Sequence, residues 1–257
     1  MRFASLGSGS DGNALVVQYR NSCVLMDCGF SVNETSVRLA RLGLTPSSLS
    51  GIVVTHEHSD HIAGVARLAR KYSIPVWLTH GTRQAHAAKG MVHMSGITEI
   101  DPHSCFSIGD MEVQPYIVPH DAAEPVQYVF SNGVKRLGVL TDTGSATKHI
   151  EAMLNGCDAL VLECNHDVAM LANGNYPSSL KQRVGGRFGH LNNAAAAALL
   201  ASLDNSRLQH IVAAHLSRRN NTPQLAVKAL SSALDCHEDW IAVASQDHGL
   251  AWREILG

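Results

Sequence analysis

The sequence predicts an α/β protein in which two β-sheets pack against each other and helices cover their outer sides. Short apolar runs typical of strands dominate the first half of the chain as hairpins, and helices then alternate with strands. This order favours a layered architecture, because a sheet buries its apolar face only against another layer. No linker, repeat or low-complexity tract interrupts the sequence, so residues 1–257 are expected to form a single domain.

The individual elements follow from hydrophobic periodicity. Runs rich in β-branched and aliphatic residues predict ten strands. These strands cover residues 14–19, 23–27, 52–55, 76–78, 112–118, 126–130, 137–141, 159–163, 210–214 and 240–243. Apolar residues at helical spacing, several of them behind a capping residue, predict five helices. These helices cover residues 34–42, 61–71, 146–154, 193–203 and 223–234, and the alanine run 194–198 fits a tightly packed helix.

Composition narrows the function classes. A net charge of -2 gives no global basic field, so contact with nucleic acid requires a local basic patch. The six cysteines form no CxxC pair, which indicates buried, reduced thiols rather than a disulfide scaffold or a zinc knuckle. No segment approaches the roughly 20 apolar residues of a membrane span, and the first residues lack a long apolar core. A cytoplasmic protein without membrane contact is therefore expected.

Histidines provide the main clue to function. The chain has 15 of them, and they concentrate beside aspartates at the ends of apolar runs. A predicted strand leads directly into a cluster of four potential metal ligands, His56, His58, Asp60 and His61, at the start of a predicted helix. Neutral imidazoles and carboxylates suit zinc, manganese or iron, and two such ions a few ångströms apart can activate one water.

Four ligands are too few for two ions, so further ligands must come from distant parts of the chain. His120, Asp142 and His215 each follow a predicted strand, which makes them candidates. The alternative for each is an ordinary core residue that hydrogen-bonds to the backbone. That alternative is weak for the cluster at residues 56–61, because desolvated imidazoles beside a carboxylate are costly without an ion.

The motif THEHSDH, followed by a later His, Asp and His, is similar to the pattern of the metallo-β-lactamase superfamily, and the resemblance spans nearly the whole chain. It implies a four-layer αβ/βα sandwich of two mixed β-sheets flanked by helices, with two divalent metal ions at one edge. One ion would be held by His56, His58 and His120, the other by Asp60, His61 and His215, with Asp142 bridging them. Asp27 resembles the superfamily's early aspartate, which supports the metal-binding loop from behind; its alternative is a turn residue.

Three further segments, at residues 6–13, 163–167 and 188–193, resemble the YycJ/WalJ branch of the superfamily. This resemblance implies a 5′-to-3′ exonuclease acting on DNA ends, or a hydrolase of small cyclic phosphodiesters. A bridging aspartate disfavours β-lactamase activity. The segment between Asp142 and His215 is too short for the inserted cap domain of RNase J relatives, and no flexible arm of the tRNase Z type is evident. Both absences argue against a structured RNA substrate.

In the expected reaction, a hydroxide bridging the two ions attacks phosphorus. Asp60 or Asp142 accepts the water proton, and His190 orients the phosphate or protonates the leaving oxygen. His166 is a second candidate for lining the site, although either histidine can instead be a supporting hydrogen-bond donor.

Candidate substrate contacts lie in a glycine-rich turn and in basic segments. They are Ser8, Ser10, Asn192 and Arg218, with Lys181, Arg183, Arg187 and Arg219 as neighbouring cations. A tight hairpin turn and a solvated basic surface are the alternatives. Two rival functions remain open: a thioester hydrolase of the glyoxalase II type, and a binding module for DNA ends or nucleotides that keeps metal for structural reasons.

Overall fold

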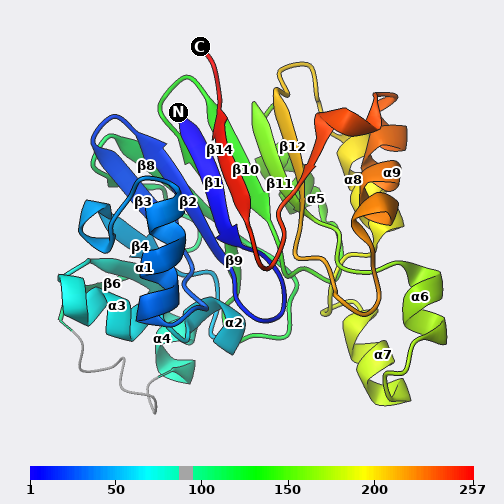
Figure 1. Cartoon of the computed structure of the whole chain (residues 1–257), viewed down its shortest axis with the longest axis horizontal. Coiled ribbons are helices and arrows are strands. Elements are labelled where there is room, and N and C mark those ends of the chain that lie inside the picture. Colours follow the sequence, from blue (N-terminus) through cyan, green and yellow to red (C-terminus); the bar gives the residue numbers. More distant parts are fainter. Residues whose placement is uncertain (87–94) are drawn as a thin grey trace.

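The computed structural model describes residues 1–86 and 95–257, which form two seven-stranded sheets packed face to face (Figure 1). The first sheet has the order β14 (Leu250–Glu254), β1 (Arg2–Gly7), β2 (Ala14–Tyr19), β3 (Ser22–Met26), β4 (Gly51–Val53), β5 (Val76–Thr79) and β6 (Ile97–Ile100). The second has the order β13 (Ile241–Val243), β12 (His210–Ala214), β11 (Ala159–Glu163), β10 (Arg136–Leu140), β9 (Val126–Ser131), β8 (Met111–Ile117) and β7 (Phe106–Ile108).

Both sheets are mixed. Strands β14, β1, β2 and β3 pair antiparallel, whereas β3 to β6 run parallel. In the second sheet β10 to β13 run parallel, and β7 to β10 alternate in direction. The expectation that the first half consists of hairpins is therefore wrong for β3 to β6, where helices connect strands that share one direction.

Helices cover both outer faces and complete four layers (Figure 1). Helices α1 (Val32–Arg41), α2 (Ser59–Ile62), α3 (Val65–Tyr72) and α4 (His80–Ala85) lie on the side of the first sheet. Helices α5 (Lys148–Leu154), α8 (Asn193–Ser202) and α9 (Pro223–Leu234) cover the second. Helices α6 (Val168–Asn173) and α7 (Ser178–Val184) project at the lower right of the view. Two short 3₁₀ turns, η1 (Pro46–Ser48) and η3 (Glu238–Trp240), complete the named elements.

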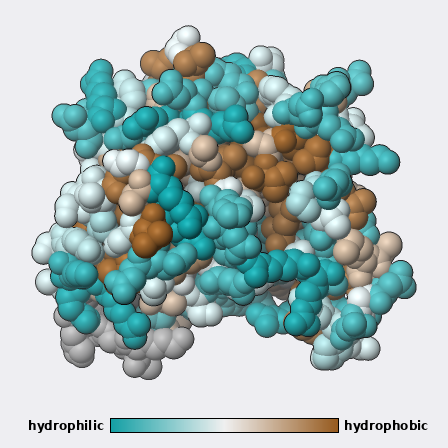
Figure 2. Space-filling view, viewed as in Figure 1, coloured by the Kyte–Doolittle hydropathy of each residue, from teal (hydrophilic) through white to brown (hydrophobic). Residues whose placement is uncertain are grey.

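Three apolar clusters hold these layers together. The central cluster fills the space between the sheets and includes Phe3, Met26, Val113 and Phe130. A second cluster joins the first sheet to its helices, and a third joins the second sheet to α5, α8 and α9. Figure 2 shows a largely hydrophilic surface on this face, with apolar residues gathered around the second sheet. The predicted four-layer sandwich is thus confirmed.

One predicted helix is wrong. The segment 61–71 divides into α2 and α3, because Gly64 interrupts the helical hydrogen bonding and donates its N–H to the carbonyl of Cys28. A side chain at Gly64 would lie 2.0 Å from the carbonyl oxygen of Phe30, so this close approach requires glycine. Sequence reasoning also missed β1, β6, β7, β14, α4, α6 and α7.

All six cysteines are free of disulfide bonds. The expectation of buried thiols holds for Cys23, Cys28, Cys157 and Cys164 but is wrong for Cys105, which is exposed, and for Cys236, which is partly exposed. Within residues 1–86 and 95–257, no helix combines the length and the apolar character that a membrane span requires.

The carboxyl ends of β3, β4, β8, β10, β11 and β12 meet at one edge of the sandwich, since strands that run in the same direction end on the same side. Three residues that follow these strands adopt the left-handed conformation, Asp27 (φ 62°), Asp142 (φ 51°) and His215 (φ 54°). Non-glycine residues adopt this conformation at a cost, and such strain concentrates at functional sites.

Candidate metal centre

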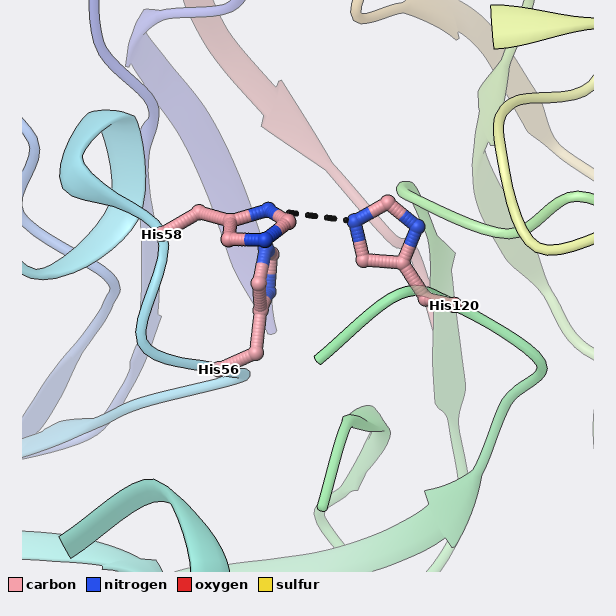
Figure 3. A group of neighbouring side chains, drawn as sticks. All are labelled: His56, His58 and His120. Carbon is pink, nitrogen blue, oxygen red and sulfur yellow. Dashed lines mark hydrogen bonds between the residues drawn. The ribbon is translucent and has the colours of Figure 1, made fainter. Parts of the chain in front are cut away.

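Three histidines from two different loops converge at this edge (Figure 3). His56 and His58 follow β4, and His120 follows β8. One ring nitrogen from each lies within 4.8 Å of the others, and Nδ1 of His58 is 3.3 Å from Nε2 of His120. The three nitrogens are close enough together to bind one metal ion.

A second set lies beside the first and contains Asp60, His61, Asp142 and His215, whose ligand atoms also lie within 4.8 Å of one another. Nε2 of His61 is 3.3 Å from Oδ2 of Asp60 and 3.2 Å from Oδ2 of Asp142. The other oxygen of Asp142, Oδ1, is 3.4 Å from Nε2 of His215 and 4.0 Å from Nε2 of His120. Asp142 therefore stands between the two sets, as the predicted bridging position requires.

Hydrogen bonds on the far side of each ring orient these imidazoles. Nδ1 of His120 donates to the carbonyl of Gly189 at 3.1 Å, and Nδ1 of His215 donates to Oδ1 of Asn13 at 3.1 Å. Nε2 of His58 donates to the carbonyl of Asp121 at 3.2 Å. Each of these bonds fixes one nitrogen as the protonated one and leaves the other nitrogen with its lone pair toward the cluster.

Asp27 supports His61 and the preceding loop from behind. Its Oδ2 accepts from Nδ1 of His61 at 2.8 Å and from the hydroxyl of Thr55 at 2.9 Å, while Oδ1 accepts from the backbone N–H of Thr55 at 2.8 Å. The Thr55 hydroxyl in turn accepts from Nδ1 of His56 at 2.9 Å. Asp27 is buried, and one carboxylate thus sets the position of two candidate ligands.

Two buried acceptor atoms at the site show whether its residues fit a metal ion. Nε2 of His56 and Oδ2 of Asp142 have no hydrogen-bond partner within the described part of the chain. Burial lowers the pKa of His56 well below its usual range, with His61 lowering it further, so the ring is neutral and its free nitrogen carries a lone pair. Buried acceptors are costly without a partner, and a cation in this position would satisfy both. The residues therefore fit divalent metal ions.

The charge around His61 leads to the same conclusion. Burial acts to lower the pKa of His61, but Asp142, Asp60 and Asp27 together raise it well above the usual range. Burial likewise acts to raise the pKa of Asp142, yet His215 and His61 hold it well below its ordinary value. A buried group of carboxylates around one imidazole needs positive charge, which a bound cation supplies better than a single proton.

Sequence reasoning assigned no role to Glu163, which follows the same rule as the predicted ligands. It ends β11, is fully buried, and forms with Asp142, His190 and His215 a third group of potential ligands. Its Oε1 accepts from Nδ1 of His190 at 2.7 Å, and its Oε2 accepts from the backbone N–H groups of Thr143 and Leu191 at 3.1 Å. In the sequence, the position of Glu163 at the end of a predicted strand could have identified it as a candidate site residue.

His190 lies where the sequence predicted a catalytic histidine, 3.6 Å from Oδ1 of Asp142. Burial acts to lower the pKa of His190, but Glu163, with Asp142 and Asp60, raises it to about 9. His166 is buried, and among residues 1–86 and 95–257 its Nδ1 has no hydrogen-bond partner. Within the same residues it belongs to none of the potential ligand groups and does not line the adjacent cleft. The described cleft lining thus includes His190 but not His166, although Glu163 and His190 lie close enough to His166 to affect its pKa.

A cleft of about 400 Å³ opens over the candidate ligands. Its floor includes His58, Asp60, Asp142, His190 and His215. One wall comes from the N-terminal turn and the start of α2, through Ser10 and Ser59; the other comes from the α6–α7 hairpin, through Tyr176, Leu180, Arg183 and Val184. Nε of Arg183 donates to Asp121 at 2.6 Å, so α7 is tied to the loop that carries His120.

The predicted substrate contacts divide into two kinds. Ser10 lines the cleft, whereas Ser8 is only 7% exposed and its hydroxyl accepts from the backbone N–H of His215 at 2.8 Å. Asn192 caps α8 through the N–H of Ala195. Arg218 forms ion pairs with Asp11 and Asp247 outside the cleft lining. The partners of these three residues are structural. Ser8 and Arg218 hold loops beside the site, and Asn192 begins a helix there.

The neighbouring cations are similarly distributed. Lys181 donates to the carbonyl of Ala172, while Arg187 and Arg219 lie over the rings of Phe188 and Tyr176. Of the basic residues that the sequence singled out, Arg183 alone is among the described residues that line the cleft.

Comparison with known proteins places the chain among relatives with this fold. The profile of the beta-lactamase superfamily domain matches residues 22–211. The chain is 40% identical over 241 residues to the exodeoxyribonuclease YycJ of Bacillus anthracis, covering 91% of this chain and 89% of that protein. It is 35% identical over 229 residues to the exodeoxyribonuclease WalJ of Streptococcus pneumoniae serotype 2, covering 88% and 85%.

Among solved structures, Zn²⁺-bound PqqB from Methylobacterium extorquens superimposes with a TM-score of 0.74 at 16% identity, covering 99% of this chain and 100% of that one. At this identity the match shows the shared fold alone. Together with the matched domain and the full-length relatives, the four layers and the ligand pattern lead to one assignment: the chain belongs to the metallo-β-lactamase superfamily and, within it, to the YycJ/WalJ-like proteins.

Proposed function

We propose that the protein is a metal-dependent phosphodiesterase that removes nucleotides from the 5′ end of DNA. The observation that carries this proposal is the convergence of seven imidazole and carboxylate side chains into two adjacent ligand sets, with Oδ1 of Asp142 in the second set 4.0 Å from Nε2 of His120 in the first. The names of the relatives support DNA as the substrate, since both are exodeoxyribonucleases. The 5′ direction follows from the resemblance to the branch, and it needs its own test.

In the proposed assignment, His56, His58 and His120 would hold one ion and Asp60, His61 and His215 the second, and Asp142 would serve both. Divalent ions at this site would lower the pKa of a bound water and stabilise charge that develops on the phosphate oxygens. Zinc and manganese both suit this mixture of nitrogen and oxygen donors, and iron does too.

The protein's own groups then position the substrate and move protons. Asp60, on the cleft floor beside Asp142, accepts the proton of the attacking water. Nδ1 of His190 is held by Glu163, so Nε2 is the nitrogen free to protonate the leaving sugar oxygen. Arg183 and Ser10 on the two walls bind phosphate oxygens, and they replace Arg218 and Ser8 in this role because they line the cleft.

The test combines metal analysis with activity on three substrates. The purified protein is assayed on 5′-phosphorylated duplex DNA, on a single strand and on bis-p-nitrophenyl phosphate, with and without a chelator. The proposal expects metal-dependent release of nucleotides from the 5′ end and hydrolysis of the small phosphodiester. An Asp60→Ala variant that folds normally and keeps full metal-dependent cleavage contradicts the scheme.

Three alternatives predict other outcomes for the same purified protein. Turnover of a small cyclic phosphodiester without attack on DNA would place the protein among small-molecule phosphodiesterases. Turnover of S-lactoylglutathione without any phosphodiester hydrolysis would favour a thioester hydrolase. DNA binding by a metal-loaded protein without any hydrolysis would favour a binding module.

A further inference from the structure

The α6–α7 hairpin supplies a wall of the cleft that differs in character from the floor. Residues 176, 180, 183 and 184 follow helical spacing, so one face of α7 and the turn before it point into the cleft. Three of these residues, Tyr176, Leu180 and Val184, offer an aromatic ring and apolar carbon. The floor opposite is built from histidines and aspartates. An apolar wall suits a base, and a floor that would bind phosphate through metal ions suits the other half of a nucleotide.

The hairpin is fixed to the rest of the protein rather than free. Asp167 caps α6 through the N–H of Met170, and its own N–H donates to the carbonyl of Asn220. Nζ of Lys181 donates to the carbonyl of Ala172 and joins the two helices. Arg183 is bound to Asp121 at 2.6 Å. The wall therefore presents Tyr176 at a defined position over the floor.

Tyr176 has the surroundings of a stacking residue. Its ring is half-buried in the turn between α6 and α7, and the guanidinium of Arg219 lies 5.8 Å from the ring centroid. Aromatic rings beside arginines are the usual platform for unpaired bases, because every base has a face that stacks. A base reaches such a ring only after leaving its own duplex stack.

We infer that the cleft accepts a single unpaired strand end, with the terminal base stacked on Tyr176 and its phosphate on the floor. This inference rests on the proposed phosphodiesterase function and specifies the substrate as an unpaired DNA end. A fully paired end is then cut only after its terminal pair opens.

A spectroscopic experiment tests the stacking directly. A hydrolysis-resistant phosphorothioate strand carries 2-aminopurine as its 5′-terminal base, and stacking on an aromatic ring quenches the fluorescence of this base. The metal-loaded wild type and Tyr176→Phe are expected to quench it, whereas Tyr176→Ala is not. Phe188→Ala is the matched control, because Phe188 is a 55% exposed aromatic residue with Arg187 near its ring but does not line the cleft. Equal quenching by wild type and Tyr176→Ala overturns the inference.

Kinetics provide the second readout. Tyr176→Ala is expected to lower kcat/KM on a single strand by about 5- to 150-fold, the range that loss of one stacked base gives. With an abasic terminal nucleotide, wild type and Tyr176→Ala should cleave at the same rate. The wild type should also cut a two-nucleotide unpaired 5′ end faster than a blunt end, and equal rates on the two contradict the inference.

Different results would overturn the stacking inference and the proposed function. If the wild type hydrolyses bis-p-nitrophenyl phosphate and DNA, but Tyr176→Ala matches it on every strand, the stacking inference is wrong while the phosphodiesterase function stands. If the metal-loaded wild type hydrolyses no phosphodiester at all, the proposed function is wrong, and the stacking inference fails with it.

Discussion

Replacement of Asp27 by asparagine isolates the contribution of a carboxylate that touches no predicted metal position. Asn adopts the left-handed backbone conformation of residue 27 readily, so the change adds little strain at φ 62°. The side chain keeps its shape but exchanges one oxygen for an NH₂ group. It then cannot accept from both Thr55 N–H on one side and His61 Nδ1 and the Thr55 hydroxyl on the other.

The magnitude follows from the bonds lost. A hydrogen bond to a charged group contributes about 1.5–3 kcal/mol. Loss of the bond that orients His61 should therefore weaken metal binding by roughly 10- to 100-fold, which is also the usual effect of removing such a supporting carboxylate. We expect this loss for the ion assigned to the set that contains His61, measured by competition with a chromophoric chelator at pH 7.

Asp158→Asn is the matched control. Asp158 is as buried as Asp27 and accepts from Lys135, Arg207 and the backbone N–H of Arg136, but it belongs to none of the potential ligand groups. This variant should lower the free energy of unfolding without changing metal affinity. If Asp27→Asn binds metal as tightly as the wild type, the argument that Asp27 orients His61 is refuted.

His190→Ala should slow DNA cleavage by about 10²- to 10⁴-fold. It should change the hydrolysis of bis-p-nitrophenyl phosphate little, because p-nitrophenolate leaves without a proton. Equal losses on both substrates would contradict the role of His190 as the acid. Removing metal with a chelator should lower Tm by several degrees in a thermal scan, because ions bound only to the folded state stabilise it, and an unchanged Tm would argue against a bound ion. Gly64→Ala should lower the free energy of unfolding by about 1–3 kcal/mol in urea titrations, since the new Cβ would lie 2.0 Å from the carbonyl oxygen of Phe30.

The candidate ligands could be predicted because each follows an apolar strand, and strands running in one direction bring their ends to one edge. His56 and Asp142 lie 86 positions apart, yet β4 and β10 end at the same site. Glu163 obeys the same rule at the end of β11, but a single glutamate carries no motif, and its partner His190 is distant in sequence. Its role is visible only in the folded structure, where Oε1 of Glu163 lies 2.7 Å from Nδ1 of His190.

The substrate contacts were harder to predict because their partners are set by tertiary structure. Ser8 and Ser10 are chemically alike and two positions apart, but one is buried against the backbone of His215 and the other lines the cleft. Helices α6 and α7 have six and seven residues, too short for a clear apolar periodicity, so the wall with Tyr176 was not foreseen. The break at Gly64 was missed for a related reason, since contact with Phe30 and Cys28 decides it.

Elemental analysis after exhaustive dialysis gives the metal content of the wild type and of Asp142→Ala. The proposed bridging role of Asp142 predicts two equivalents of divalent metal per chain in the wild type and loss of at least one in the variant. A wild type that retains no metal, or an Asp142→Ala protein that retains two equivalents, contradicts the central claim.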